Sequence, residues 1–351
     1  YIIPSTFDPR LISVIPIAVA KAAIKSGVAR KKIKDFDNYK DELTNRLDPS
    51  MSLMQGINAK VRKNPKKVIF AEGEDENMLK AAIEFGKNKL GTPILIGAEK
   101  RIKEQLKKIG LDQNYKIEIV NSTNKQKREK YVKHLYKKLQ REGQLERDVD
   151  RLVRNDRIAW GSSMIACKDA DAMVTGNIRH YAASIEKLKK VVDSRPGEEI
   201  FGMTMINSKG KTILVADTNV QDFPSAQRLV NVSKSCVRVA RLFGFDPKVA
   251  FLSHSTFGNP ISKNTKHVRD AIELLKKDKV DFDFDGEMQP DVALNPIYQE
   301  TYPFSKIVGN ANILIMPGQH SAAISYKMMK TLGDTKVIGP LLIGLGLPIE
   351  I

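Results

Sequence analysis

Residues 248–260 read KVAFLSHSTFGNP, an apolar run that changes abruptly into hydroxyl, amide and glycine residues. The apolar half is typical of a buried strand. Open α/β sheets bind ligands just beyond the carboxyl ends of such strands. The hydroxyls of Ser255 and Thr256, with the backbone amides of the glycine turn, are therefore candidates to hold a phosphate. The alternative is a capping loop in which Ser262 or Asn264 begins the next helix.

Three further loops follow apolar runs in the same way, and together they predict one cleft at a sheet edge. Their polar side chains are Asn177, Arg179 and His180 in residues 175–180, Asp285 and Glu287 in residues 285–287, and His320 and Ser321 in residues 317–321. Two carboxylates flanking a glycine suit acid–base chemistry. The alternative is that Glu287 only caps a helix or pairs with a lysine.

The order of apolar runs predicts an α/β fold. Strands are expected at 68–71, 93–97, 117–120 and 172–176, with helices between them, so the first sheet should be parallel. A second unit should contain an antiparallel pair at 203–206 and 212–216, then strands near 249–252, 281–285 and 312–316. Residues 10–29 have the apolar spacing of a helix that stops near Gly27, and residues 30–50 read as a polar linker.

Composition narrows the possible functions. The 351 residues carry a net charge of +17, but the basic residues are mostly lysines spread along helical stretches, so nucleic-acid binding is not favoured. A positive surface also suits an anion with several phosphates. Cys167 and Cys236 have no metal-ligand spacing and are expected to be reduced in a cytoplasmic protein. No signal peptide or transmembrane run is present, so no membrane partner is expected.

Five stretches give a specific family resemblance. They are VIFAEGE (68–74), DADAMVTG (169–176), KVAFLSHST (248–256), FDGEMQ (284–289) and VIGPLLIGL (337–345). In this order they resemble the phosphate acetyltransferases over residues 55–351. The resemblance implies two α/β subdomains around a cleft, as in isocitrate and isopropylmalate dehydrogenases. Subdomain 1 would comprise residues 55–197 and 337–351, and subdomain 2 would comprise residues 198–336.

The first 50 residues do not fit that family. The stretch YIIPSTFDPR and the alanine-rich run after it resemble the end of the NAD(P)-binding domain of bacterial malic enzymes. This arrangement is similar to the hybrid malic enzymes, and both chain ends are expected to be cuts. The resemblance implies a parent enzyme that converts malate and NADP to pyruvate, carbon dioxide and NADPH. Its NADP and divalent metal (Mg or Mn) would bind in an upstream malic enzyme domain outside this chain.

The departures from active phosphate acetyltransferases are as informative as the matches. Lys187 stands where the family has an arginine, and lysine cannot offer bidentate phosphate geometry. Gly318, His320, Ala322 and Ala323 replace an Asp, Asn, Gly, Asn set. We therefore expect a homo-oligomeric regulatory module that binds acetyl-coenzyme A without a confident catalytic residue. The alternatives are an active acetyltransferase and a purely structural oligomerisation module.

The acetyl-coenzyme A site implied by the resemblance draws on all four loops and on the helix after His180. Its expected residues are Asn177, Arg179, His180, Lys187, Ser255, Thr256, Asp285, Glu287, His320 and Ser321.

Overall fold

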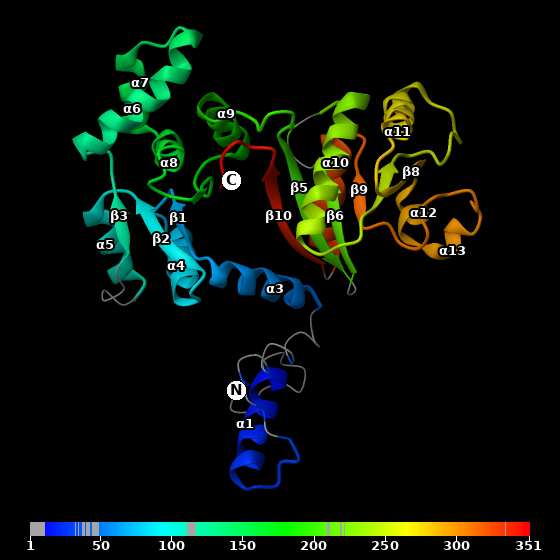
Figure 1. Cartoon of the computed structure of the whole chain (residues 1–351), viewed down its shortest axis with the longest axis horizontal. Coiled ribbons are helices and arrows are strands. Elements are labelled where there is room, and N and C mark those ends of the chain that lie inside the picture. Colours follow the sequence, from blue (N-terminus) through cyan, green and yellow to red (C-terminus); the bar gives the residue numbers. More distant parts are fainter. Residues whose placement is uncertain are drawn as a thin grey trace.

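The chain forms two α/β lobes joined by two short connections (Figure 1). The computed structural model describes residues 11–31, 33, 35, 36, 39, 43, 49–110, 117–208, 211–217, 220, 222–333 and 335–351. Lobe 1 is built on a five-stranded sheet and lobe 2 on a six-stranded sheet. The α/β fold class is therefore confirmed. No helix among the described residues is both long enough and apolar enough to span a membrane.

Lobe 1 has a fully parallel sheet in the order β11-β4-β1-β2-β3. Its strands are β1 (Lys66–Phe70), β2 (Gly91–Ile96), β3 (Glu118–Val120), β4 (Ala172–Val174) and β11 (Ile349–Glu350). Its helices are α4 (Glu76–Lys87), α5 (Glu99–Lys108), α6 (Lys125–Leu139), α7 (Glu146–Asn155), α8 (Arg157–Ala166) and α9 (Tyr181–Val191), with the 3-10 turn η1 (Gln140–Glu142). The buried apolar runs that predicted β1, β2 and β4 fill this sheet.

Helices cover both faces of the lobe 1 sheet, as a buried parallel sheet requires. The helices α6 to α9 pack on one face around Trp160, whose ring lies 4.9 Å from the ring of Tyr131 in an edge-on contact. The helices α4 and α5 pack on the other face through Leu79 and Ile102. Both residues are fully buried, so each helix is amphipathic because its apolar stripe faces the sheet.

Lobe 2 has a mixed sheet in the order β10-β5-β6-β9-β7-β8. Its strands are β5 (Phe201–Ser208), β6 (Lys211–Ala216), β7 (Lys248–Leu252), β8 (Asp283–Met288), β9 (Ile313–Ile315) and β10 (Thr335–Ile343). Its helices are α10 (Ala226–Leu242), α11 (Lys266–Asp278), α12 (Pro290–Leu294), α13 (Pro296–Gln299) and α14 (Gln319–Leu332), with the 3-10 turn η2 (Lys263–Thr265). The predicted antiparallel pair is present as β5 and β6, and β6, β9, β7 and β8 run parallel.

The lobe 2 sheet is also covered on both faces. Helices α10 and α11 bury one face, and α12 and α14 bury the other. Figure 1 shows α10 and α11 on the near side of the sheet. The carboxyl ends of β7 and β8 lie side by side, which places the loop after β7 against the end of β8.

The C-terminal segment corrects the predicted subdomain limits. Residues 337–351 were expected in subdomain 1, but β10 pairs antiparallel with β5 at the edge of the lobe 2 sheet. Of the two C-terminal strands, only β11 joins the lobe 1 sheet, through β4, although Leu342 and Leu345 also pack in the lobe 1 core. The apolar run of β10 suits either sheet, so its partner is decided by tertiary pairing and not by local sequence.

The N-terminal part contains two described helices. α1 (Leu11–Lys25) lies within the predicted helix 10–29 and is followed by Gly27 with φ +80°, in agreement with the predicted stop. Figure 1 shows α1 apart from both lobes. The residues before Leu11 and most of the predicted linker lie outside the described residues.

Helix α3 (Pro49–Lys63) lies across the two lobes in Figure 1. Its contacts agree, because Arg62 Nε donates to the Asn88 carbonyl of lobe 1 at 3.0 Å and Lys60 Nζ donates to the Leu242 carbonyl of lobe 2 at 3.5 Å.

Candidate functional site

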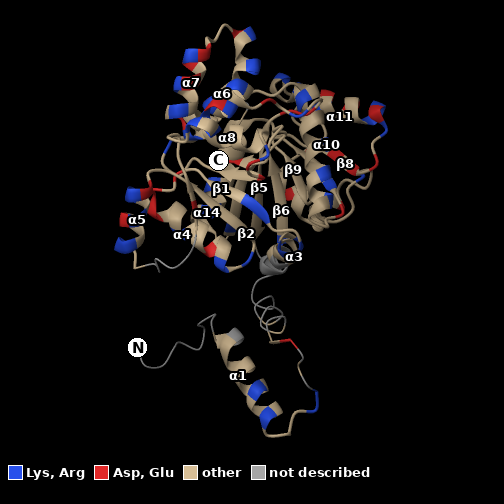
Figure 2. Ribbon diagram, turned by 60° about the vertical axis from the view of Figure 1, so that its left-hand side comes forward, with Lys and Arg blue, Asp and Glu red and all other residues tan. Residues whose placement is uncertain are grey.

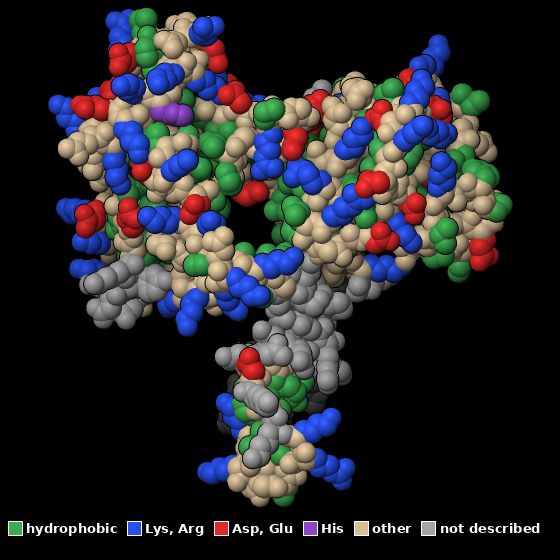
Figure 3. All heavy atoms as spheres, in the orientation of Figure 1, with side chains coloured by type: hydrophobic (Ala, Val, Ile, Leu, Met, Phe, Trp, Pro, Cys, Tyr) green, Lys and Arg blue, Asp and Glu red, His purple; other side chains and the backbone are tan. Residues whose placement is uncertain are grey.

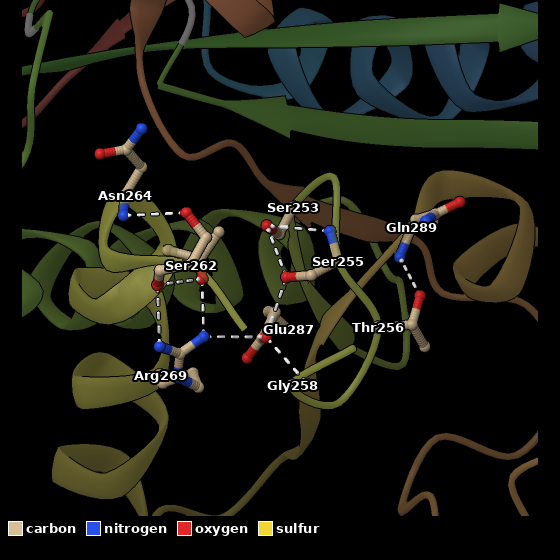
Figure 4. A network of polar contacts seen from close by, with 10 residues as sticks. Ser253, Ser255, Thr256, Gly258, Ser262, Asn264, Arg269, Glu287 and Gln289 are labelled. Atoms are coloured by element: carbon tan, nitrogen blue, oxygen red, sulfur yellow. Dashed lines mark hydrogen bonds and ion pairs between the residues drawn. The ribbon is translucent and has the colours of Figure 1, made fainter. Parts of the chain in front are cut away.

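The loop after β7 closes onto a buried carboxylate at the end of β8 (Figure 4). Glu287 is only 1% exposed. Its Oε1 accepts hydrogen bonds from the Ser255 hydroxyl at 2.9 Å, from the Gly258 amide at 3.0 Å and from Arg269 Nη1 at 3.2 Å. Arg269 also donates to the Thr265 hydroxyl and the Ser262 carbonyl. One carboxylate thus ties together the loop, the strand and helix α11.

The remaining polar groups of this loop are used locally as well. The Thr256 hydroxyl accepts from the Gln289 amide at 3.2 Å. The Ser262 hydroxyl accepts from the Asn264 amide at 3.2 Å and caps η2, as the alternative sequence interpretation proposed. Asp285 accepts from the Lys306 amide at 2.8 Å. Each of these bonds fastens one piece of lobe 2 to another.

This geometry argues against the predicted phosphate cradle at Ser255 and Thr256. The hydroxyl and the amide that were expected to bind phosphate already donate to Glu287, and both hydroxyl-bearing residues are buried. A phosphate placed there would also face the negative charge of Glu287. The loop therefore acts as a structural brace of lobe 2, which we call the Glu287 brace.

Lobe 1 has a similar brace at the ends of β1 and β4. Glu72 is 3% exposed, and its Oε1 accepts from the Thr175 hydroxyl at 2.8 Å and from the Gly176 amide at 3.1 Å. Its Oε2 is buried and has no hydrogen-bond partner. Next to this Glu72 brace, Asn177 Nδ2 donates to Asp75 at 2.6 Å. Glu72 lies two residues after the end of β1, but its role was not predicted.

Two of the predicted cations meet on Asp156. Arg179 Nη1 and Lys187 Nζ reach Asp156 Oδ2 at 2.9 and 2.7 Å. Asp156 Oδ1 also accepts from the amides of Ile158 and Ala159, and so caps α8. Burial alone would raise the pKa of Asp156, but the hydrogen bonds from Lys187 and Arg179 outweigh burial and lower it. The three charges sum to about +1 at neutral pH.

Asp156 was missed by sequence reasoning, although a signal existed. An Asp immediately before a run with helical spacing is an N-cap pattern. Its partner Lys187 lies on α9, 31 residues further along the chain. That pairing depends on how α8 and α9 pack, which local sequence does not reveal.

The other predicted residues lie at exposed positions. His180 is the N-cap residue of α9 but makes no side-chain capping bond. His320 and Ser321 are exposed in the first turn of α14. A steric constraint explains the glycine at position 318, because a Cβ there would collide with the Asp222 carbonyl. The polar residue that active acetyltransferases carry at this position would not fit without a shift of the chain.

The predicted joint pocket of the two lobes stays a prediction. Among the described residues, no hydrogen bond or ion pair joins Arg179 or Lys187 of lobe 1 to Ser255 or Thr256 of lobe 2. A cavity of about 540 Å³ lies beside Lys187 and Asp156, and all of its lining residues belong to lobe 1. Arg151 and Lys190 line it as well. The acidic residues Glu142, Asp148 and Asp156 line it too, so acids and bases are balanced around this lobe 1 cavity, and Figure 2 shows both kinds of side chain along α7.

Comparisons with known proteins agree with this architecture. The Phosphate acetyl/butaryl transferase family matches residues 52–351. An NADP-dependent malic enzyme of Rhizobium meliloti is 45% identical over all of this chain and 46% of its own length. The chain thus spans about half the length of the malic enzymes it matches. A phosphate acetyltransferase of Bacillus subtilis is 28% identical over 85% of this chain and 92% of its own length.

Solved structures give the same result for the fold. The EutD phosphotransacetylase of Staphylococcus aureus superposes with a TM-score of 0.76 at 27% identity, covering 85% of this chain and 92% of that chain. A phosphotransacetylase of Streptococcus pyogenes has the same TM-score at 29% identity, covering 85% of this chain and 91% of that chain. Both lobes and their order are therefore shared with these enzymes, and the chain belongs to the Phosphate acetyl/butaryl transferase family.

Proposed function

We propose that this chain is an acetyl-coenzyme A-binding regulatory and oligomerisation module of a larger malic enzyme. The parent would oxidatively decarboxylate malate to pyruvate with NADP. Its NADP and divalent metal would bind outside this chain. The relatives that match the whole chain are malic enzymes of about twice its length, which supports this assignment.

The observation that carries the proposal is the contrast between a buried, hydrogen-bonded hydroxyl loop in lobe 2 and an open cavity in lobe 1. The hydroxyl loop of lobe 2 is engaged by Glu287. In lobe 1, the cations Arg151, Lys187 and Lys190 line an open cavity of about 540 Å³ together with three carboxylates. Acetyl transfer needs positioned donors around a phosphate and a base for the thiol. Binding a polyanion needs only accessible positive charge and room. The described site fits binding better than transfer.

Lys187 supports the same choice. It keeps a positive charge, but its single ammonium is already hydrogen-bonded to Asp156 at 2.7 Å. A guanidinium at this position would have donors to spare for a phosphate, whereas an ammonium so engaged offers fewer. Control of a distant active site would then act through a coupling free energy, typically about 1–3 kcal/mol.

An exposed apolar stripe supports the oligomerisation part of the proposal. Ile324, Met328 and Leu332 recur every four residues along α14 and are 59%, 56% and 82% exposed. Such a stripe is unfavourable in water and favours burial against a second subunit. Met328→Glu should lower the molar mass measured by light scattering, and Lys330→Glu on the same helix serves as the control.

The second candidate function is acetyl transfer between coenzyme A and phosphate. It is favoured by the match of nearly the whole fold to phosphotransacetylases. A paired test separates the candidates, namely calorimetry with acetyl-coenzyme A and an assay for acetyl phosphate formation. We expect binding with little or no turnover. Turnover comparable to a dedicated acetyltransferase would overturn the regulatory assignment, and absence of binding would leave a purely structural role.

Lys187→Glu locates the binding within this test. It reverses the charge beside the cavity and should weaken acetyl-coenzyme A binding by about tenfold or more. Lys276→Glu is the matched control, because Lys276 is an exposed helical lysine of lobe 2 whose ion pair, within the described part of the chain, is with Glu273. Equal affinities of the two variants would contradict a site in lobe 1.

A further inference from the structure

Seven basic side chains gather on lobe 1, where α3 leads into β1. All of them are exposed, and we call them the basic belt: Lys60, Arg62, Lys63, Lys66, Lys67, Lys87 and Lys89. Figure 3 shows Lys and Arg side chains along α3 and at the lower end of α4. Residues 60–67 and 87–92 contain no Asp or Glu. The basic belt is therefore a strongly positive surface.

Folding brings the separate segments of the basic belt together. Arg62 Nε donates to the Asn88 carbonyl at 3.0 Å, which sets the end of α3 beside the end of α4. Lys66 of β1 pairs with Gly91 of β2, so the start of β1 also lies next to the turn that follows α4. The end of α3, the end of α4 and the start of β1 therefore form one surface.

Within the described part of the chain, no ion pair joins a cation of the basic belt to an acid. Two acids adjoin the belt, but each accepts a hydrogen bond from another group. Glu84 accepts from Asn88 Nδ2 at 2.8 Å, and Asp171 accepts from the Lys67 amide at 2.8 Å. Even with both acids counted, the belt keeps an excess of about five positive charges at neutral pH.

Local structure accounts for only part of this excess of positive charge. A cation is favoured in the last turn of a helix, which explains Lys63 on α3 and Lys87 on α4. The same effect does not explain Lys66 and Lys67, because these residues begin β1. Like charges on one surface repel one another and destabilise the folded chain. A partner of opposite charge would relieve that repulsion.

We propose that the basic belt docks an acidic face of the malic enzyme domain that would precede this chain, an inference that rests on the proposed function. The malic enzymes that match the whole chain are about twice its length, which leaves a domain of similar size to dock. The belt lies where the chain enters lobe 1, so a preceding domain would be tethered beside it at a high effective concentration. Docking there would place that domain against the lobe that carries the cavity beside Lys187.

Other occupants fit the basic belt less well. A second copy of this chain would bring its own net charge of +17 to a cationic surface. Nucleic acid is not favoured, because residues 60–67 and 87–92 contain no aromatic side chain that could stack on a base. A small phosphate ligand would need a cavity, and the cavity beside Lys187 is lined by none of the belt residues.

Zero-length cross-linking of the whole parent enzyme tests the docking. A carbodiimide joins a lysine amine directly to a carboxylate, and mass spectrometry identifies the linked peptides. We expect links from Lys66, Lys67 and Lys89 to carboxylates upstream of Tyr1. Their yield should fall about fivefold or more when the salt concentration rises from about 0.1 to about 0.5 M, because exposed charges are screened. No link from the belt, or an equal yield from the exposed Lys277 of lobe 2, would overturn the proposal.

Charge reversal shows whether the positive charge of the basic belt causes the links. A triple variant should lower the yield from the remaining belt lysines about tenfold or more; its substitutions are Lys63→Glu, Lys66→Glu and Lys87→Glu. The control changes the net charge equally at three exposed lysines near the end of α11 and should alter the yield less than about twofold; its substitutions are Lys276→Glu, Lys277→Glu and Lys279→Glu. Equal yields in the two triple variants would contradict docking at the belt.

Calorimetry with acetyl-coenzyme A on the same proteins separates this proposal from the proposed function. The belt variant should lose the links and keep its affinity for acetyl-coenzyme A, because no belt residue lines the cavity beside Lys187. Links without acetyl-coenzyme A binding would overturn the regulatory assignment alone. Binding without links would overturn the docking alone.

Discussion

The two lobes carry the same kind of brace, but only the brace of lobe 2 includes a cation that pairs with the buried glutamate. In each, a buried glutamate at a strand end accepts from a hydroxyl and from a glycine amide of a neighbouring loop. Glu287 also has Arg269, whereas Glu72 has an oxygen without a partner. The cations of lobe 1 are instead gathered on Asp156, near the open cavity.

The difference indicates that the two lobes have different roles, one structural and one in ligand binding. A complete, buried network fixes its loop and leaves nothing for a ligand. Partly exposed cations beside a cavity keep the capacity to bind one. We therefore regard the strand ends of lobe 2 as scaffold and the helix-lined cavity beside Lys187 in lobe 1 as the ligand side. The substitutions below test this contrast.

Of the substitutions considered, Glu287→Ala should lower the free energy of unfolding most. It leaves the Ser255 hydroxyl, the Gly258 amide and Arg269 without their shared acceptor, and breaking such a buried pair costs about 4 kcal/mol. Urea unfolding of lobe 2, followed by hydrogen exchange of β7 and β8, would measure it. The control Glu273→Ala, in an exposed pair on α11, should cost under about 0.5 kcal/mol. An equal loss of unfolding free energy in Glu287→Ala and Glu273→Ala would contradict a scaffold role for the Glu287 brace.

Glu350→Gln should remove a pH dependence of stability. Burial raises the pKa of Glu350 to about 7, although the Leu342 amide opposes the shift. The folded state then holds a proton that the unfolded chain has already lost, so stability falls as pH rises from about 4.5 to about 7, by roughly 3 kcal/mol. The melting temperature of the variant should vary less with pH over this range and should be higher than that of the wild type at pH 8. The same pH dependence of the melting temperature in both proteins would show that Glu350 is not buried as described.

Asp156→Ala should cost about 2 kcal/mol, roughly half from the lost helix cap and half from two partly exposed ion pairs. The contribution of Asp156 is present at neutral pH and lost on acidification, because its pKa is lowered. Amide exchange in the first turn of α8 would report the loss. Glu186→Ala, which removes only an exposed pair with Lys190, should leave α8 unchanged.

Glu72→Gln should have the smallest effect, under about 1 kcal/mol. The amide oxygen can keep both hydrogen bonds of Oε1, and the amide nitrogen replaces an oxygen that has no partner. Thermal unfolding of this variant beside Glu287→Gln makes the comparison direct. A larger loss for Glu72→Gln than for Glu287→Gln would reverse the contrast between the lobes.

The parts of the fold that could be predicted from sequence are those with strong local patterns. Apolar runs bounded by polar turns located β1, β4 and β7, and the order of strands and helices predicted a parallel sheet. The partner of β10 could not be predicted, because its strand pairs with β5 more than a hundred residues away. Pairing over such distances depends on packing that no local window contains.

The site shows the same limit. The strand-end loops were located correctly, but the partners of their side chains were not. The hydroxyl of Ser255 looked available for a ligand until Glu287 proved to accept from it. The charge of Lys187 looked free until Asp156 proved to share it. Which polar group satisfies another is set by tertiary geometry, and this determines whether a loop binds a ligand or braces the fold.

The most direct test of the central claim is hydrogen exchange of the chain with and without acetyl-coenzyme A. The account predicts slower exchange in residues 142–156 and 179–190 of lobe 1, around the cavity beside Lys187, and no change in residues 253–260 of lobe 2. Protection confined to residues 253–260 would contradict it and would restore the hydroxyl loop as the ligand site.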